Sequence, residues 1–265
     1  MRKPPLGQHF LIDPIVLQRI VEAGEINELD TVLEVGPGKG VLTRELITRA
    51  KSVIAIEMDP KLARNLPAKV NNPANLTVLC EDARTFELDA SALLPASYKM
   101  VANLPYYAGS RIVRRLLEST FKPSLMVVTL QKEVAEAMVA EPGSMSILSV
   151  GIQFFGIPRI VCMVMPNAFR PPPRVTSAVV RIDVRPTPAV EVPDIDDFFS
   201  VVHAGFAAPR KQIRNSLSQG MGFPPADVEQ LLTESGIDHH RRPSTLSISE
   251  WAHLYHTHLD RQTSN

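Results

Sequence analysis

Residues 31–43 read TVLEVGPGKGVLT, an apolar run of strand length that passes directly into a loop with three glycines and then into a helical pattern. Glycine lets the backbone pass close to a ligand, and the first turn of a helix offers it unpaired N–H groups. A nucleotide-like ligand is the natural occupant of such a turn. The spacing misses the dinucleotide pattern GxGxxG because Val41 stands at the third glycine position. Taken alone, the loop also fits a simple tight turn.

The same order of strand and helix recurs through the first two-thirds of the chain. Apolar runs of strand length stand at residues 31–36, 52–57, 76–80, 99–103 and 125–130. Helical spacing is found at residues 41–50, 60–70, 109–120 and 131–140, and before them an amphipathic helix opens at Asp13-Pro14 and runs to about residue 23. This alternation predicts an α/β fold with an open, mostly parallel sheet covered by helices on both faces.

The pattern changes after residue 140. A helical stretch at residues 146–155 precedes two apolar runs at 159–165 and 176–184, which we expect to form an antiparallel pair. Residues 185–193, RPTPAVEVP, carry three prolines and are typical of a linker. A small all-helical domain is predicted beyond it, with helices at residues 195–207, 211–219, 225–235 and 247–259. The expected domains are therefore residues 1–185 and residues 186–265.

The composition is that of an ordinary globular protein. Of 265 residues, 45% are hydrophobic and 21% charged, which excludes a disordered polymer. Lys plus Arg number 28 and Asp plus Glu number 28, so any polyanionic partner has to be held by a local patch. Cys80 and Cys162 lack a CxxC partner, which argues against a disulfide framework and a zinc site. Because no 18-residue apolar run occurs, we expect a cytoplasmic protein that is neither exported nor membrane-spanning.

Acidic residues follow the second and third predicted strands. Glu57 closes the second strand about 20 residues after the glycine loop, where a carboxylate can accept both hydroxyls of a ribose. Asp82 follows the third strand. Carboxyl ends of parallel strands meet at one edge of the sheet, so a single adenosine could contact the loop and both acids. Glu81 is better explained as a solvated loop carboxylate.

The fourth predicted strand ends in Asn103-Leu104-Pro105-Tyr106. An exocyclic adenine amine is a poor nucleophile because its lone pair is delocalised into the ring. An Asn oxygen and a backbone carbonyl that accept its two N–H bonds favour a more tetrahedral nitrogen, while proline fixes the turn and tyrosine offers a ring for stacking the base. No strong general base is needed if the electrophile is a sulfonium methyl group, since the nitrogen attacks first and then loses its proton. Catalysis would then consist mainly of positioning.

With these motifs in place, the sequence resembles the small-subunit ribosomal RNA adenine N6,N6-dimethyltransferases, most closely their archaeal members. The resemblance rests on GQHFLID at 7–13, LEVGPGKGVLT at 33–43, VIAIEMD at 53–59, EDA at 81–83, NLPYY at 103–107, LQKEVAEAM at 130–138, AFRPPPRVTSAVVRI at 168–182 and RKQIRNSL at 210–217. It implies a Rossmann-like class I methyltransferase sheet that binds S-adenosyl-L-methionine, with a C-terminal helical domain for the RNA. The implied reaction is dimethylation of two adjacent adenosines near the 3′ end of small-subunit rRNA, late in assembly of the pre-30S particle.

The resemblance also implies residue roles. His9 and Leu11 would cover the methionine part of the cofactor, with Gly36 beneath it and Glu34 anchoring its ammonium group. The implied cofactor-binding residues are His9, Leu11, Glu34, Gly36, Gly38, Glu57 on the ribose, Asp82 on the adenine, and Asn103. The implied catalytic residues are Asn103, Leu104, Pro105, Tyr106 and Phe169, of which Tyr106 and Phe169 would sandwich the flipped adenine.

Basic side chains fall in three groups that are poor in acid. We expect RNA phosphate contacts from Arg111, Arg114 and Arg115, from Arg170 and Arg174 with Arg181 and Arg185 nearby, and from Arg210, Lys211 and Arg214. Three features depart from the bacterial pattern of the family. His9 replaces an Asn that many bacterial members have, Tyr107 and the AGS after it differ, and the basic motif at 209–217 is one residue poorer.

Two other functions stay open on the sequence alone. A DNA N6-adenine methyltransferase would use the same chemistry, and a non-catalytic ribosome-assembly or nucleic-acid-binding factor could keep the same fold. The intact EVGPGKG and NLPY segments favour retained catalysis. We expect no metal, because His253, His256 and His258 have no acid or cysteine beside them, and we expect a monomer.

Overall fold

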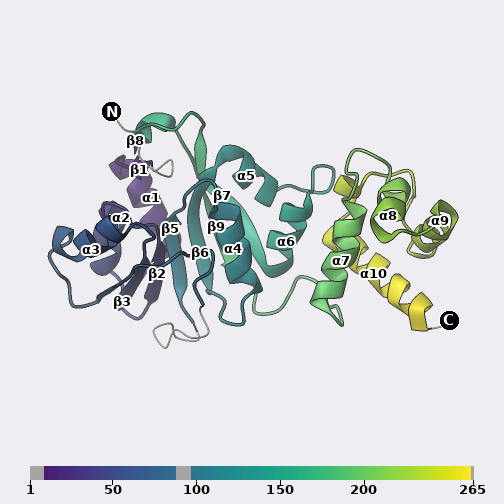
Figure 1. Ribbon diagram of the computed structural model, residues 1–265, viewed down its shortest axis with the longest axis horizontal. Helices are drawn as coiled ribbons and strands as arrows, with labels where there is room; N and C mark the ends of the chain where they lie inside the picture. The colour runs from purple at the N-terminus through teal and green to yellow at the C-terminus, as the bar shows by residue number, and fades with distance from the viewer. Residues whose placement is uncertain (1–8, 88–96, 264–265) are drawn as a thin grey trace. The chain divides into compact units, whose positions relative to one another are not determined.

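The computed structural model describes residues 9–87 and 97–263 and divides them into two compact units (Figure 1). The first unit holds the described residues up to Glu136 together with Gly156–Pro186. The second holds Ala137–Phe155 and the described residues from Thr187 onward. The boundary at 186 is one residue from the expected one, but Ala137–Phe155, which we expected in the first domain, pack with the helical unit instead.

A seven-stranded sheet forms the centre of the first unit, in the order β4-β3-β2-β5-β6-β9-β7. The first five strands in this order are parallel, and β9 lies antiparallel between β6 and β7. Both the parallel sheet and its antiparallel closing pair are thus confirmed. The strands are β2 Thr31–Val35, β3 Ser52–Ile56, β4 Leu76–Leu79, β5 Lys99–Asn103, β6 Leu125–Gln131, β7 Gly156–Val164 and β9 Ser177–Val184.

Helices of this unit begin where their caps predict. Asp13 accepts the N–H of Ile15 at 2.8 Å and Asp59 accepts that of Lys61 at 2.8 Å, each just before a proline in the first turn. Because these caps are local, the sequence is sufficient to place them. The helices are α1 Pro14–Gly24, α2 Val41–Ile47, α3 Pro60–Lys69, α4 Gly109–Glu118 and α5 Lys132–Met138.

A second, two-stranded sheet was not predicted. β1 Phe10–Leu11 pairs antiparallel with β8 Phe169–Arg170, which follows the 3-10 turn Pro166–Ala168. Leu11 stands opposite Phe169, and both are buried in the apolar cluster beneath α1. Two-residue strands are too short to show periodicity, so only the fold brings them together. This pairing ties the start of the described chain to the strand edge where the site lies.

The second unit is helical, as expected. Phe154 and Phe155, which end α6, stack on Phe198 and Phe199 of α7, and Tyr255 of α10 extends the cluster. These ring contacts explain why the segment before β7 belongs to this unit. The helices are α6 Ile147–Phe155, α7 Ile195–Gly205, α8 Ile213–Met221, α9 Pro225–Glu234 and α10 Ile248–Thr263, with a 3-10 turn at Pro243–Thr245. In the described parts of the chain, no helix has the length and apolar character to cross a membrane.

Candidate active site

The glycine loop between β2 and α2 has a backbone that other residues rarely adopt. Gly36, Gly38 and Gly40 have φ angles of 70°, 57° and 79°. A Cβ on Gly36 would lie 3.6 Å from the carbonyl oxygen of Asn103, and one on Gly38 would lie 2.9 Å from the ring of Phe10. The loop therefore packs closely between the end of β5 and the β1 segment, and a side chain at Gly38 would clash with Phe10.

Two buried carboxylates stand at the ends of β2 and β3. Glu57 accepts the Gly38 N–H at 3.1 Å through Oε2 and the Asp59 N–H at 3.0 Å through Oε1. Burial raises the pKa of Glu57, although these backbone hydrogen bonds act against the rise. Glu34 is only 1% exposed, and its Oε2 has no hydrogen-bond partner in the described chain. Burial raises the pKa of Glu34 to about 8; the Thr43 side chain acts against the rise, and the nearby Glu57 carboxylate adds to it.

A buried carboxylate oxygen that lacks a hydrogen-bond partner suits a positively charged ligand. Leaving such an oxygen without a partner is costly, and a bound ammonium group would satisfy it. The adjoining glycine loop lines the same cavity as this carboxylate. On these two observations, the residues present fit S-adenosyl-L-methionine, whose methionine part carries an ammonium group.

Asp82 follows β4 and is bound by a residue that we did not predict. Arg84 donates to both of its carboxylate oxygens, with Nε at 3.0 Å from each and Nη2 at 2.6 Å from Oδ2. The hydrogen bonds and charge of Arg84 lower the pKa of Asp82, and the charge of Arg111 acts in the same direction. The Arg84 guanidinium also lies over the ring of Tyr107, 5.6 Å from its centroid.

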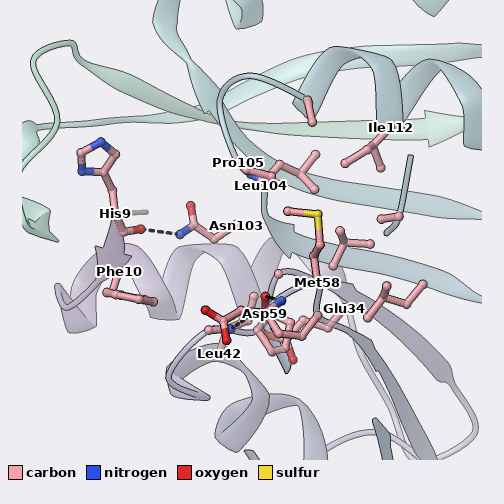
Figure 2. A pocket seen from close by; sticks show the side chains of 18 of the residues that line it. His9, Phe10, Glu34, Leu42, Met58, Asp59, Asn103, Leu104, Pro105 and Ile112 are labelled. Carbon is pink, nitrogen blue, oxygen red and sulfur yellow. Dashed lines mark hydrogen bonds between the residues drawn. The ribbon is translucent and has the colours of Figure 1, made fainter. Parts of the chain in front are cut away.

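The NLPY segment leaves the end of β5 beside the glycine loop. Asn103 Nδ2 donates to the carbonyl oxygen of His9 at 3.3 Å, as Figure 2 shows. The Tyr106 hydroxyl is 2.5 Å from the Ser177 hydroxyl on β9. The His9 ring lies against the Tyr106 ring, with centroids 5.6 Å apart and planes 28° from parallel. The donated Nδ2 leaves the Oδ1 of Asn103 as an acceptor for another group.

One cavity gathers nearly all the predicted site residues. Its wall includes Phe10, Met58, Arg84 and Tyr107, which the sequence analysis did not assign to the site. Phe10 belongs to the quoted GQHFLID motif and Tyr107 to the stretch that departs from the bacterial pattern, so both carried a signal. The predicted residues on the wall are His9, Leu11, Glu34, Gly36, Gly38, Glu57, Asp82, Asn103, Leu104, Pro105 and Tyr106. Their individual roles stay predictions.

Phe169 is not on this wall. It is 2% exposed and packs in the apolar cluster beside Leu11, its partner in the two-stranded sheet. The sequence placed it near the turn but could not show that the β1 pairing would bury its ring. The structure therefore does not bring Phe169 and Tyr106 together around a space for the adenine.

The predicted RNA-contacting side chains differ in what they contact. Arg114 pairs with Glu118 and Arg214 with Glu229, and Arg115 donates to the Ala83 carbonyl at 3.2 Å. Arg181, expected beside them, is 9% exposed and bonds Glu25 and Asp183, so it is a structural ion pair and the expectation of a phosphate contact there is wrong. The exposed members are Arg111, Arg170, Arg174, Arg210 and Lys211.

A possible metal-ligand group lies in the second unit. Asp238, His239 and His240 place one ligand atom each within 4.8 Å of one another. All three belong to one loop, and Asp238 Oδ1 accepts the His240 N–H at 2.9 Å. The expectation that the protein binds no metal stays a prediction.

Comparison with known proteins identifies the family. Residues 2–258 match the family model described as ribosomal RNA adenine dimethylase. The chain belongs to this family. A relative from Dehalococcoides mccartyi named ribosomal RNA small subunit methyltransferase A is 44% identical over 249 residues, 94% of this chain and 86% of the relative. One of the same name from Clostridium botulinum is 40% identical over 94% of this chain and 91% of the relative. Both are bacterial, and the expected likeness to archaeal members stays a prediction.

Solved structures agree with the fold. The 23S rRNA methyltransferase ErmE has a TM-score of 0.74 and 30% identity, with 94% of this chain and 98% of that chain covered. A dimethyladenosine transferase from Plasmodium falciparum has a TM-score of 0.78 at 24% identity, over 93% and 96% of the two chains, and bears on the fold alone. The Rossmann-like methyltransferase fold is confirmed. The protein is an S-adenosyl-L-methionine-dependent rRNA (adenine-N6,N6)-dimethyltransferase, which sets aside the DNA and non-catalytic alternatives.

Proposed function

We propose that this enzyme dimethylates two adjacent adenosines near the 3′ end of small-subunit rRNA, on a pre-30S particle late in assembly. The observation that carries the reaction is the placement of Asn103 and the Leu104–Pro105 turn beside the glycine loop and the buried Glu34. The choice of subunit is supported by identity, which is 44% to a small-subunit methyltransferase and 30% to the 23S enzyme.

Each cofactor-binding residue contacts the part of the cofactor that its chemistry fits. Glu34 holds the ammonium group, because its free carboxylate oxygen is buried at the cavity. Glu57 faces the ribose hydroxyls and Asp82 the adenine amine, since each acid lies where its strand reaches the ligand-binding edge of the sheet. Leu11 and the main chain of His9 cover the methionine part, with Gly36 and Gly38 forming the floor beneath it. When bound, S-adenosyl-L-methionine supplies an electrophilic methyl group on a sulfonium.

The target-side residues orient the amine. Asn103 Oδ1 and the backbone carbonyl at Leu104 accept its two N–H bonds and turn its lone pair toward the methyl carbon. Tyr106 offers its ring to the base and is held in place by the Ser177 hydroxyl 2.5 Å away. No charged base is required, because the nitrogen becomes cationic on attack and then readily loses its proton. Orientation therefore supplies most of the catalysis.

RNA is held by exposed basic groups. We assign phosphate contacts to Arg111, Arg170 and Arg174 in the first unit and to Arg210 and Lys211 in the second. They are supported by three further arginines that contact Glu118, the Ala83 carbonyl and Glu229, namely Arg114, Arg115 and Arg214. The second unit is accordingly the RNA-substrate domain, and the first is the catalytic domain. We propose a monomer located in the cytoplasm.

Substrate choice is the direct test. Purified protein would be incubated with labelled S-adenosyl-L-methionine and with undermethylated 30S particles, 50S particles or duplex DNA carrying adenines. We expect methyl incorporation into the 30S particles, approaching four methyl groups per particle if two adenosines each take two. Incorporation into 50S particles alone would move the enzyme to the large subunit. Cofactor binding without transfer to any substrate would support the non-catalytic assembly role instead.

A further inference from the structure

The imidazole of His9 is held by two contacts on the target side of the cavity. Its Nδ1 is 2.7 Å from the carbonyl oxygen of Pro171. Because a carbonyl oxygen only accepts, Nδ1 carries the proton and donates it. The ring itself is stacked on Tyr106, with centroids 5.6 Å apart. The side chain is therefore docked on Tyr106.

His9 also contacts Asn103, the residue that the proposed function assigns to the target amine. Its backbone carbonyl accepts from Asn103 Nδ2 at 3.3 Å (Figure 2). One residue therefore touches both Asn103 and Tyr106, the two side chains that the proposed function assigns to the adenine. The contact with Asn103 comes from the backbone and the contact with Tyr106 from the ring, so the ring can move while the backbone contact stays.

The two rings are too close for a base to lie between them. Aromatic layers in contact are about 3.5 Å apart, so a base between two rings needs them about 7 Å apart. The observed centroid separation is 5.6 Å. Phe169 is 2% exposed and off the cavity wall, so within the residues that the structure describes, His9 is the ring that covers Tyr106.

We propose that the His9 imidazole holds the place of the target adenine in the free enzyme, and that the everted base enters by displacing it from Tyr106. This inference rests on the proposed function, since it assumes that adenine stacks on Tyr106. The place-holder keeps the face of Tyr106 covered until RNA arrives, and base entry exchanges one ring stack for another. The ring leaves by rotating its side chain, which breaks the Nδ1 hydrogen bond to Pro171 and the stack on Tyr106.

The test observes the ring contact directly. In protein with ¹³C-labelled histidine rings and unlabelled surroundings, the His9 ring signal is assigned by its loss in His9→Ala. Contacts between the His9 and Tyr106 ring protons are then recorded for the free enzyme, with S-adenosylhomocysteine, and with an RNA hairpin presenting two adjacent unpaired adenosines. We expect the contact in the first two states and its loss with the hairpin. A hairpin with uridines at those positions should leave it intact.

Kinetics provide an independent readout. His9→Ala should lower the KM for the RNA about fivefold, because no ring has to be displaced, while the dissociation constant for S-adenosylhomocysteine stays within about twofold. His253→Ala removes an exposed histidine of α10 and serves as the matched control, with no change in either quantity. Melting curves identify any loss of folding.

The outcomes separate the inference from the proposed function. If the wild-type enzyme methylates the adenosine hairpin while the ring contact persists in the bound state, His9 is not a place-holder. An unchanged or raised KM for RNA in folded His9→Ala has the same meaning. If wild-type protein transfers methyl groups to no RNA, the proposed function fails whatever the ring contact does.

Discussion

Glu34 shows how one side chain links binding to pH. Its carboxyl group is 1% exposed, and burial raises its pKa to about 8, so at neutral pH the free enzyme carries it mainly protonated. A cationic ammonium group binds the charged form. The cost of ionising Glu34 is therefore part of the cost of binding the cofactor below pH 8.

From this we predict a pH-dependent cofactor affinity. Binding should strengthen as the pH rises from 6.5 to about 8, because the carboxyl group no longer has to release a proton, and weaken again at higher pH, where the ligand's amino group loses the charge that Glu34 binds. Calorimetry in buffers of different ionisation enthalpy should detect proton release at pH 7 and proton uptake at pH 9. Glu34→Gln should bind more weakly and lose the proton release. If Glu34→Gln still released a full proton on binding the cofactor, that proton would come from a group other than Glu34.

Arg84 and Tyr107 contact each other beside Asp82, the residue proposed to bind the cofactor adenine. Arg84 binds both oxygens of Asp82 while its guanidinium lies over the Tyr107 ring, so each residue fixes the other. We predict that Arg84→Met and Tyr107→Ala each weaken cofactor binding by a few-fold. The double variant should bind the cofactor no more weakly than the more affected of the two single variants. Titration calorimetry on the four proteins measures this. Strictly additive losses would mean that the two side chains act separately.

Among single residues, the sequence predicted best those whose position follows from the topology of the sheet alone. Glu34, Glu57, Asp82 and Asn103 stand at strand ends, and parallel strands bring their ends to one edge. The contact of the His9 ring with Tyr106 was not predictable, for the opposite reason. Its position depends on a hydrogen bond to Pro171, 162 residues away along the chain, and no local pattern encodes such a contact.

Helices and strands also differ in how well the sequence predicts them. The caps of α1 and α3 and the strands of the large sheet were predictable, since each depends on neighbouring residues or on a run of several apolar ones. The β1 and β8 pair was not, because each strand has two residues. That pair buries Phe169, which the sequence alone did not reveal.

Close packing of α7 against α8 depends on a glycine. A Cβ on Gly220 would lie 2.4 Å from both the Cα and the carbonyl oxygen of Ala204, and backbone cannot move aside without separating the helices. We predict that Gly220→Ala lowers the free energy of unfolding by about 1–3 kcal/mol. The matched control is Gly151→Ala in α6, where a Cβ would meet nothing within 4 Å. Denaturant titration of both variants checks this, and equal stability would show that the helices tolerate the shift.

The molecule as a whole carries no net charge, so its RNA binding depends on patches. Arg210 and Lys211 are exposed near the start of α8, in the unit assigned to the RNA. Replacing both by Gln should reduce the slope of log affinity against log salt by roughly 1 to 2, through lost counterion release. Arg64→Gln, an exposed arginine on α3, is the control and should leave the slope unchanged. If both variants change it equally, binding is not localised to this patch.

Domain organisation was predictable in outline only. The proline-rich stretch marks the change of unit, but Ala137–Phe155 lie before it in sequence and pack with the helices after it. The cause is the cluster of four phenylalanines from α6 and α7, a long-range contact that hydrophobic spacing within either helix does not reveal.

In the proposed function, Asn103 and the adjoining turn orient a small-subunit rRNA adenine for double methylation. The most direct measurement is mass spectrometry of small-subunit rRNA from cells lacking this protein, complemented with the wild type or with Asn103→Ala. The wild type should restore N6,N6-dimethyladenosine at two adjacent positions near the 3′ end, and folded Asn103→Ala should restore none while binding cofactor within a few-fold of normal. Full dimethylation by that variant would contradict the account.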